Sequence, residues 1–402
     1  MPYPKKKHVP VIIVLAFLVF SMLPSTVHSE TSTDAKPACY ACSNPLISSN
    51  NDPSSSCYVK YTLVLINNTL VNGNLMGSAC YLHTSGITFD PRNGYIYVTN
   101  SLSNTVSMIN GSTNKVTGYI LVGQCPSGIT FDPSNGYLYV TNMESGSVSV
   151  INGSDSKVIE TITVGASPVA VSFDFSNKDI YVANVCSDNV TVINGSANKV
   201  ISSINVGKSP QALSFDSDND HLYVANCCSS NVSVINDTTN KVSYSVNVGT
   251  FPRGVTVDSA DGYVYVANFW SDNVSVINGT ENKVIYSIAA GHFPVGLCYD
   301  SRNGNVYAVN EGSNSVSVIR GTSNRVVYTI AVGRSPQGLL FDFINGYLYV
   351  TDYASGTVSI ISIVNHPVDY ASISEIYYIM GAVVALAIIV PGIALIRKRR
   401  RH

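Results

Sequence analysis

The sequence predicts an all-β fold, a seven-bladed β-propeller, from two observations. The first is a tyrosine that recurs every 42 residues without one insertion or deletion. The second is that each tyrosine opens a near-copy of one phrase, such as Tyr139-Val-Thr-Asn142. A fixed period of about 40–45 residues is typical of propeller blades, which cannot bury their apolar faces alone. The seven tyrosines are Tyr97, Tyr139, Tyr181, Tyr223, Tyr265, Tyr307 and Tyr349.

Each 42-residue repeat predicts four short antiparallel strands. In the repeat over residues 126–164, we expect them at 128–132, 137–142, 147–152 and 157–165. The second and third of these segments alternate large side chains with small or polar ones, which is the period of a strand. The pair Asn135-Gly136 separates the first two, and Asn-Gly between apolar runs is a strong hairpin signal. The blade is therefore a four-stranded meander.

The ring needs one strand from the N-terminal side to close. First and second strands occur seven times, but fourth strands occur only six times after residue 84. Residues 69–77 read like the fourth-strand segment 114–123, so we expect them to complete the last blade. Segment 60–67 resembles a third strand. Either it or segment 357–363 therefore supplies the third strand of blade seven. Closure by an N-terminal strand removes exposed sheet edges.

The repeated phrase also resembles a known family. Tyr97-Val-Thr-Asn100 and its copies, ending in Tyr349-Val-Thr-Asp352, are similar to the repeats of YVTN-type β-propeller proteins. The resemblance covers roughly residues 57–363. It implies a surface or surface-layer (S-layer) associated propeller of archaea or bacteria, and it brings no catalytic residues with it.

The two ends of the chain predict export and membrane anchoring. Residues 1–29 have a basic start, an apolar stretch and a polar end, as a signal peptide does. A Cys-containing segment (30–56), the propeller (57–363) and a linker (364–375) follow. Residues 376–396 are apolar and long enough to cross a bilayer. The basic tail 397–402 belongs on the cytoplasmic side. We expect a single-pass membrane protein with an extracellular propeller.

Asn-x-Ser/Thr sequons recur through the repeats and predict glycosylation in an exported chain. The alternative is that asparagine and glycine simply make good turns here, so that repetition multiplies the sequons. The candidate sites are Asn67, Asn110, Asn152, Asn189, Asn194, Asn231, Asn236, Asn273 and Asn278.

The nine cysteines of an exported chain favour disulfides over metal or redox chemistry. Candidate pairs are Cys80 with Cys125 in adjacent blades, and Cys186 with Cys228 in equivalent loops. A zinc site at Cys39-x-x-Cys42 is a weaker alternative, because no second pair accompanies it. Nine is odd, and Cys298 is the candidate for a buried free thiol. The full disulfide set is Cys39, Cys42, Cys57, Cys80, Cys125, Cys186, Cys227 and Cys228.

Charge is sparse, at 12% of residues with a formal net charge of −2. This argues against a nucleic-acid partner, because such binders need clustered Lys and Arg. Few carboxylates would need neutralising in acid, so we also expect tolerance of low pH.

One cluster stands out as a candidate binding site. The loops of blades five and six bring together Arg253, His292 and four aromatic residues, including Trp270, the only tryptophan. Aromatic rings beside polar groups are typical of recognition sites. The alternative is that the rings wedge between blades and pack the rim. The predicted site residues are Phe251, Arg253, Phe269, Trp270, His292 and Phe293.

No pattern predicts a metal, a cofactor or catalysis. An aspartate in each of the seven first turns could form a calcium ring, but aspartate at such positions usually caps the turn. We also expect Ser85, Ser127, Gln211, Arg253 and Gln337 to ring the mouth of a central channel.

These features favour a surface module for binding or adhesion, whose partner is an extracellular protein or a glycan. A structural envelope protein that assembles with copies of itself is the alternative, and a propeller enzyme is less favoured.

Overall fold

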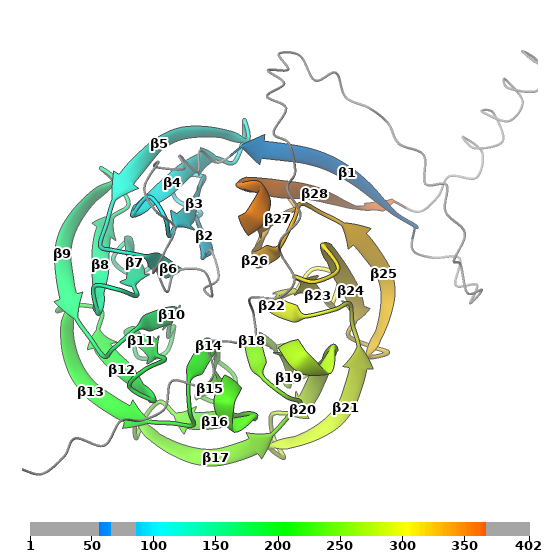
Figure 1. Ribbon diagram of the computed structural model, residues 1–402. Coiled ribbons are helices and arrows are strands. Elements are labelled where there is room, and N and C mark those ends of the chain that lie inside the picture. Colours follow the sequence, from blue (N-terminus) through cyan, green and yellow to red (C-terminus); the bar gives the residue numbers. More distant parts are fainter. Residues whose placement is uncertain (1–55, 66–85, 367–402) are drawn as a thin grey trace, which may run out of the picture. The chain divides into compact units, whose positions relative to one another are not determined.

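The computed structural model describes residues 56–65 and 86–366, which form a seven-bladed β-propeller of four-stranded antiparallel sheets (Figure 1). The predicted fold class is confirmed. In the repeat over residues 126–164, the strands lie at 126–132, 137–142, 147–152 and 157–163, close to the predicted segments.

Each blade runs outward from a first strand near the axis to a fourth strand at the rim (Figure 1). The first strands are β2 (Ile87–Asp90), β6 (Pro126–Asp132), β10 (Pro168–Phe173), β14 (Pro210–Asp216), β18 (Pro252–Asp258), β22 (Pro294–Asp300) and β26 (Pro336–Asp342). The second are β3 (Tyr95–Asn100), β7 (Tyr137–Asn142), β11 (Asp179–Asn184), β15 (His221–Asn226), β19 (Tyr263–Asn268), β23 (Asn305–Asn310) and β27 (Tyr347–Asp352).

The third strands are β4 (Thr105–Asn110), β8 (Ser147–Asn152), β12 (Asn189–Asn194), β16 (Asn231–Asn236), β20 (Asn273–Asn278), β24 (Ser315–Arg320) and β28 (Thr357–His366). The fourth are β5 (Lys115–Leu121), β9 (Lys157–Thr163), β13 (Lys199–Asn205), β17 (Lys241–Asn247), β21 (Lys283–Ala289), β25 (Arg325–Ala331) and β1 (Ser56–Leu65). Short 3-10 turns follow three second strands: η3 (Cys227–Ser229), η4 (Phe269–Ser271) and η5 (Tyr353–Ser355).

Strand β1 closes the ring as the fourth strand of blade seven. It pairs antiparallel with β28 from Ser56 opposite His366 to Leu65 opposite Thr357. The other edge of β28 pairs with β27, so the C-terminal segment is the third strand. Closure by an N-terminal strand is confirmed. The closing segment is 56–65, however, rather than 69–77, which lies outside the described residues.

The repeated tyrosine is buried in every blade, and in four blades it donates a hydrogen bond to the next blade. All seven tyrosines are buried, none more than 1% exposed. The Tyr139 hydroxyl accepts a hydrogen bond from Asn135 and donates one to Asn198 Oδ1 in the following blade, at 2.8 Å. Tyr349 donates in the same way to Asn114 Oδ1 at 2.9 Å, which joins blade seven to blade one. The periodic tyrosine is therefore a structural residue.

The asparagine that ends the repeated phrase is also structural. Asn142 is buried, and its Nδ2 donates to Ser147 Oγ at 3.2 Å and Ser149 Oγ at 2.9 Å on the third strand. In blade seven Asp352 takes this position and accepts a hydrogen bond from Ser359 Oγ at 2.6 Å. Burial raises the pKa of Asp352 to about 6, although these hydroxyl donors oppose the shift.

In the part of the chain that the structure describes, no helix has the length and apolar composition needed to cross a membrane. The predicted signal peptide, membrane helix and basic tail lie outside the described residues, as does most of the Cys-containing segment and of the linker. Strand β28 continues to His366, past the predicted end of the propeller at residue 363.

Candidate binding site on blades five and six

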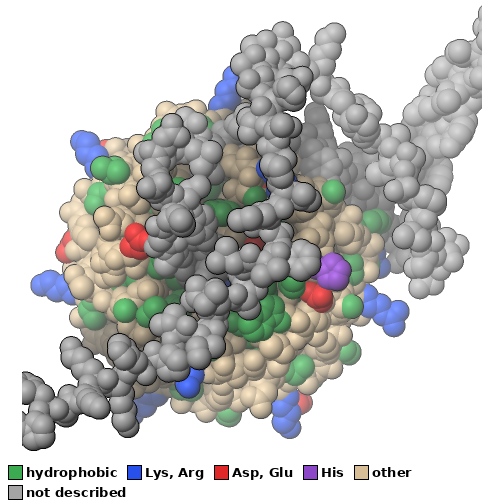
Figure 2. All heavy atoms as spheres, viewed as in Figure 1, with side chains coloured by type: hydrophobic (Ala, Val, Ile, Leu, Met, Phe, Trp, Pro, Cys, Tyr) green, Lys and Arg blue, Asp and Glu red, His purple; other side chains and the backbone are tan. Residues whose placement is uncertain are grey.

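The loop before each first strand and the loop after each second strand lie together on one face. Phe269 N donates to Phe251 O at 3.0 Å in blade five, and Glu311 N donates to Phe293 O at 2.9 Å in blade six. Two neighbouring loop pairs therefore bring the predicted site residues together. On the face drawn in Figure 2, hydrophobic side chains gather beside a histidine and an acidic side chain.

Four rings form a continuous array, which we name the aromatic ladder: Trp270, Phe251, Phe269 and Phe293. Trp270 stacks on Phe251 with ring centroids 4.2 Å apart, and Phe269 stacks on Phe293 at 4.7 Å. Phe251 and Phe269 join the two pairs at 6.0 Å. The two ends face solvent, since Trp270 is 54% exposed and Phe293 is 42% exposed. The ladder is partly packing and partly open surface.

Arg253 supports the ladder from below. Its guanidinium carbon lies 4.9 Å from the centroid of the Phe269 ring, a cation–π geometry. Its Nη1 lies 3.4 Å from Glu311 Oε2, and Arg253 is only 8% exposed. Burial lowers the pKa of Arg253 and raises that of Glu311, and each charge opposes the shift of the other. Arg253 is thus a buried support rather than a surface contact.

Beside the exposed end of Phe293 lies a polar pair. His292 Nδ1 is 2.9 Å from Asp272 Oδ2, and Asp272 Oδ1 accepts a hydrogen bond from Phe293 N at 2.8 Å. Both side chains are exposed, at 76% for His292 and 40% for Asp272. The Phe293 N–H and the histidine hold the pKa of Asp272 below its usual value. Sequence reasoning missed Asp272, because a loop aspartate is common and only its partners single it out.

The backbone also distinguishes the ladder. Phe251 and Phe293 have φ angles of 60° and 55°, in the left-handed region, where bulky side chains are rare. The equivalent residues of three other blades are Ser167, Ser209 and Ser335, with similar φ. The repeat therefore accepts serine here, and two blades carry phenylalanine instead. Alignment of the repeats could have found this signal.

The predicted channel mouth is present in part. The first strands enclose a cavity of about 180 Å³ around the axis, lined mostly by glycine and aliphatic residues with Gln211, Arg253 and Gln337. Gln337 is buried, and its Oε1 has no hydrogen-bond partner among the described residues. Ser127 is buried, and Ser85 lies outside the described residues.

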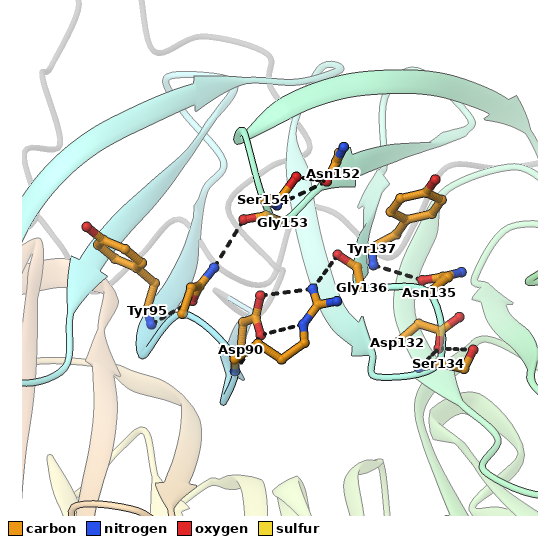
Figure 3. Close-up of polar contacts among 12 residues, drawn as sticks. Asp90, Tyr95, Asp132, Ser134, Asn135, Gly136, Tyr137, Asn152, Gly153 and Ser154 are labelled. Carbon is orange, nitrogen blue, oxygen red and sulfur yellow. Dashed lines mark hydrogen bonds and ion pairs between the residues drawn. The ribbon is translucent and has the colours of Figure 1, made fainter.

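The aspartates cap turns, as expected, at the ends of the first strands, and Figure 3 shows two of them, Asp90 and Asp132. Asp90 Oδ1 accepts a hydrogen bond from Arg92 N at 2.9 Å, and Asp132 Oδ1 accepts one from Ser134 N at 2.8 Å. In the described ranges, no group of three or more His, Cys, Asp or Glu residues could hold a metal ion. The aspartates have a structural role in these turns.

One of these aspartates meets a second carboxyl group. Asp237 lies where five other blades have glycine, and both it and Asp174 are buried. Burial is the largest cause that raises the pKa of Asp174, to about 7, and a hydrogen bond and repulsion from Asp237 add to it. A carboxyl group that is buried near a second one favours its protonated form, which is the direction found for Asp174.

The predicted disulfide between Cys186 and Cys228 is wrong, since both cysteines, and Cys227, are free thiols. Cys125 is disulfide-bonded. Cys298 is free, as predicted, and burial raises the pKa of its thiol to about 12.

The described sequons lie at the two ends of third strands. Asn110 Oδ1 accepts hydrogen bonds from Ser112 N and Thr113 N, and Asn278 Oδ1 accepts them from Thr280 N and Glu281 N. These asparagines therefore cap turns as well, and all eight described sequon asparagines are half-buried.

Comparison with known proteins supports the propeller fold. No known family profile matches the chain, and no curated protein matches it. Among solved structures, hydrazine synthase of Kuenenia stuttgartiensis is similar at 20% identity and a TM-score of 0.64, over 72% of this chain and 99% of that one. Virginiamycin B lyase from Staphylococcus aureus is similar at 16% identity and a TM-score of 0.64, over 76% and 100%. At these identities the likeness shows the β-propeller fold alone, and membership of the YVTN family stays a prediction.

Proposed function

We propose that this protein is a cell-surface recognition module that binds an external partner through the aromatic ladder. The observation behind the proposal is that Trp270 and Phe293 stay 54% and 42% exposed although their rings are stacked and supported from below. Rings that only packed the rim would be covered. Pre-ordered, solvent-facing aromatic groups are typical of binding hot spots, because little conformational entropy is lost on binding.

The location belongs to the same proposal. A signal peptide, a membrane helix at 376–396 and a cytoplasmic tail would place the propeller outside the cell, with glycans on some sequons. The resemblance to YVTN surface proteins favours this placement. The binding face would then meet molecules of the cell exterior.

Self-assembly is a second candidate function, which a different observation favours. The fourth strands carry exposed apolar side chains, including Tyr244 (52% exposed), Tyr286 (52%) and Ile201 (54%). Such strands are the outer edges of their sheets, and apolar edges promote association with other strands. Copies of the chain could pack through this rim in an envelope layer.

The test is binding of the full-length protein to intact prokaryotic cells and to isolated cell envelopes. Trp270→Ala should abolish saturable binding. Alanine is the natural residue at the equivalent position of blade seven, Ala354. The control is Phe343→Ser, which removes a phenylalanine that is 60% exposed but lies outside the ladder. Ordered oligomers without cell or envelope binding would instead favour self-assembly.

A further inference from the structure

The surroundings of the ladder restrict the chemistry of its ligand. The four charged groups nearest the rings form two opposite pairs, Arg253 with Glu311 and His292 with Asp272. Arg253 and Glu311 balance each other largely below the surface, so the carboxylate of Asp272 is the charge that these four groups present to a ligand. An anionic ligand would meet this like charge and lose hydration without gaining a counter-charge, so the site favours a neutral ligand over an anionic one.

The exposed apolar surface consists of separate platforms. Among the described residues of these two loop pairs, the large exposed apolar side chains are Trp270 and Phe293, at opposite ends of the ladder. The same loops also carry short polar residues, such as Thr250, Ser271 and Ser313. A stable protein interface buries about 800 Å² on each partner around a contiguous apolar centre. Two isolated rings suit ligands with small flat apolar faces.

Hydrogen-bonding groups lie next to one of these platforms. Asp272 presents a carboxylate that keeps its charge, fixed by Phe293 N at 2.8 Å, and His292 sits 2.9 Å from it. A carboxylate and an imidazole beside a ring can accept from and donate to neighbouring hydroxyls. A pyranose combines these needs, because its C–H face stacks on an aromatic ring while its edge carries hydroxyls.

We propose that the aromatic ladder binds a neutral oligosaccharide, with one pyranose on Trp270 and another on Phe293, and with the hydroxyls of the second bound by Asp272 and His292. This inference rests on the proposed function. The half-buried rings of Phe251 and Phe269 separate Trp270 from Phe293. A single pyranose is about as large as one aromatic ring, so it cannot cover both exposed rings. An oligosaccharide therefore binds more tightly than its monosaccharide.

The chain provides its own reporter, because Trp270 is its only tryptophan. The full-length protein is titrated with cellotetraose, mannotetraose and chitotetraose, and with glucose, mannose and N-acetylglucosamine. Tetragalacturonic acid is the charged comparison. A tetrasaccharide that stacks on Trp270 shifts its emission to shorter wavelength and saturates, and the matching monosaccharide binds at least about tenfold more weakly.

Each substitution at the site introduces the residue found at the equivalent position of another blade. Phe293→Ser copies Ser209, and Asp272→Asn copies Asn314 and keeps an oxygen for Phe293 N. Both should weaken saccharide binding about tenfold or more, whereas Phe343→Ser should not change it. Equal binding by all variants, or tighter binding of tetragalacturonic acid, would overturn the proposal. No response to any neutral saccharide, with envelope binding retained, would also overturn it and indicate a protein partner. Loss of both would overturn the recognition function itself.

Discussion

The buried carboxyl pair of Asp174 and Asp237 predicts that the propeller becomes more stable as the pH falls. The pKa of Asp174 is raised from 3.8 to about 7 in the folded protein, first by burial and then by Asp237. A raised folded pKa gives stabilisation that is complete below the unfolded value, near pH 4, and is lost as the pH rises to about 7. The free energy of unfolding should therefore fall between pH 4 and pH 7.

The size of this change in the free energy of unfolding follows from the pKa shift of Asp174. One pKa unit corresponds to about 1.4 kcal/mol, so this residue contributes up to about 4 kcal/mol across the window. Asp352, with a pKa raised to about 6, acts in the same direction. Asp174→Asn removes the titrating group but keeps the oxygen that accepts from Ser176 N at 2.7 Å. This variant should match the parent at pH 4 and be more stable than the parent at pH 8.

The assay is guanidinium unfolding followed by circular dichroism at pH 4, 5, 6, 7 and 8. Asp237→Gly, which restores the residue of five other blades, should reduce the pH dependence but not remove it, because burial of Asp174 remains. Asp155→Asn, at an exposed turn carboxylate, is the control and should leave the profile unchanged. A parent whose stability is flat or rises from pH 4 to pH 7 would refute the reasoning.

Three further predictions concern the ladder, the ring closure and the thiols. Gly312→Ala places a methyl group 2.6 Å from Phe293 Cδ2, so the ring must move. Envelope binding should fall while circular dichroism stays unchanged, and unchanged binding would contradict the role of Phe293. Tyr349→Phe removes the bond to Asn114 between the last and first blades, and it should lower the free energy of unfolding by about 1–3 kcal/mol in guanidinium titration. No loss of stability would show that this bond contributes nothing to closure. After brief iodoacetamide treatment, mass spectrometry should find the exposed thiols of Cys186 and Cys228 modified and the buried thiol of Cys227 unmodified until the protein unfolds. Rapid labelling of Cys227 would contradict its burial.

The sequence predicted the fold well because the repeat restates the same physical constraints in every blade. The tyrosine at each 42nd position is buried, and several of these tyrosines donate a hydrogen bond to the next blade, so the period follows from the geometry of the ring. The closing strand was harder to predict. Segments 56–65 and 69–77 both have strand character, and only the pairing of β1 with β28 distinguishes them.

The sequence predicts which residues come together in the candidate site, but not which of them are buried and which are exposed. Equivalent loops of adjacent blades must be neighbours, which is enough to bring the rings together. Burial of Arg253 under Phe269 depends on the channel wall, and the role of Asp272 depends on the left-handed turn that aims Phe293 N at it. The disulfide prediction failed because equivalence in a repeat does not determine the distance or direction between two side chains, and Cys186 and Cys228 are both free, exposed thiols.

The most direct test of the account compares binding with stability in one variant, the double substitution Phe251→Ser and Phe293→Ser. Both positions adopt the backbone that serine adopts in blades three, four and seven. The half-exposed rings should contribute only about 1–2 kcal/mol each to stability. The account predicts a folded variant whose envelope binding falls at least about tenfold. Unchanged binding, or a loss of folding that accompanies the loss of binding, would contradict it and reduce the ladder to packing.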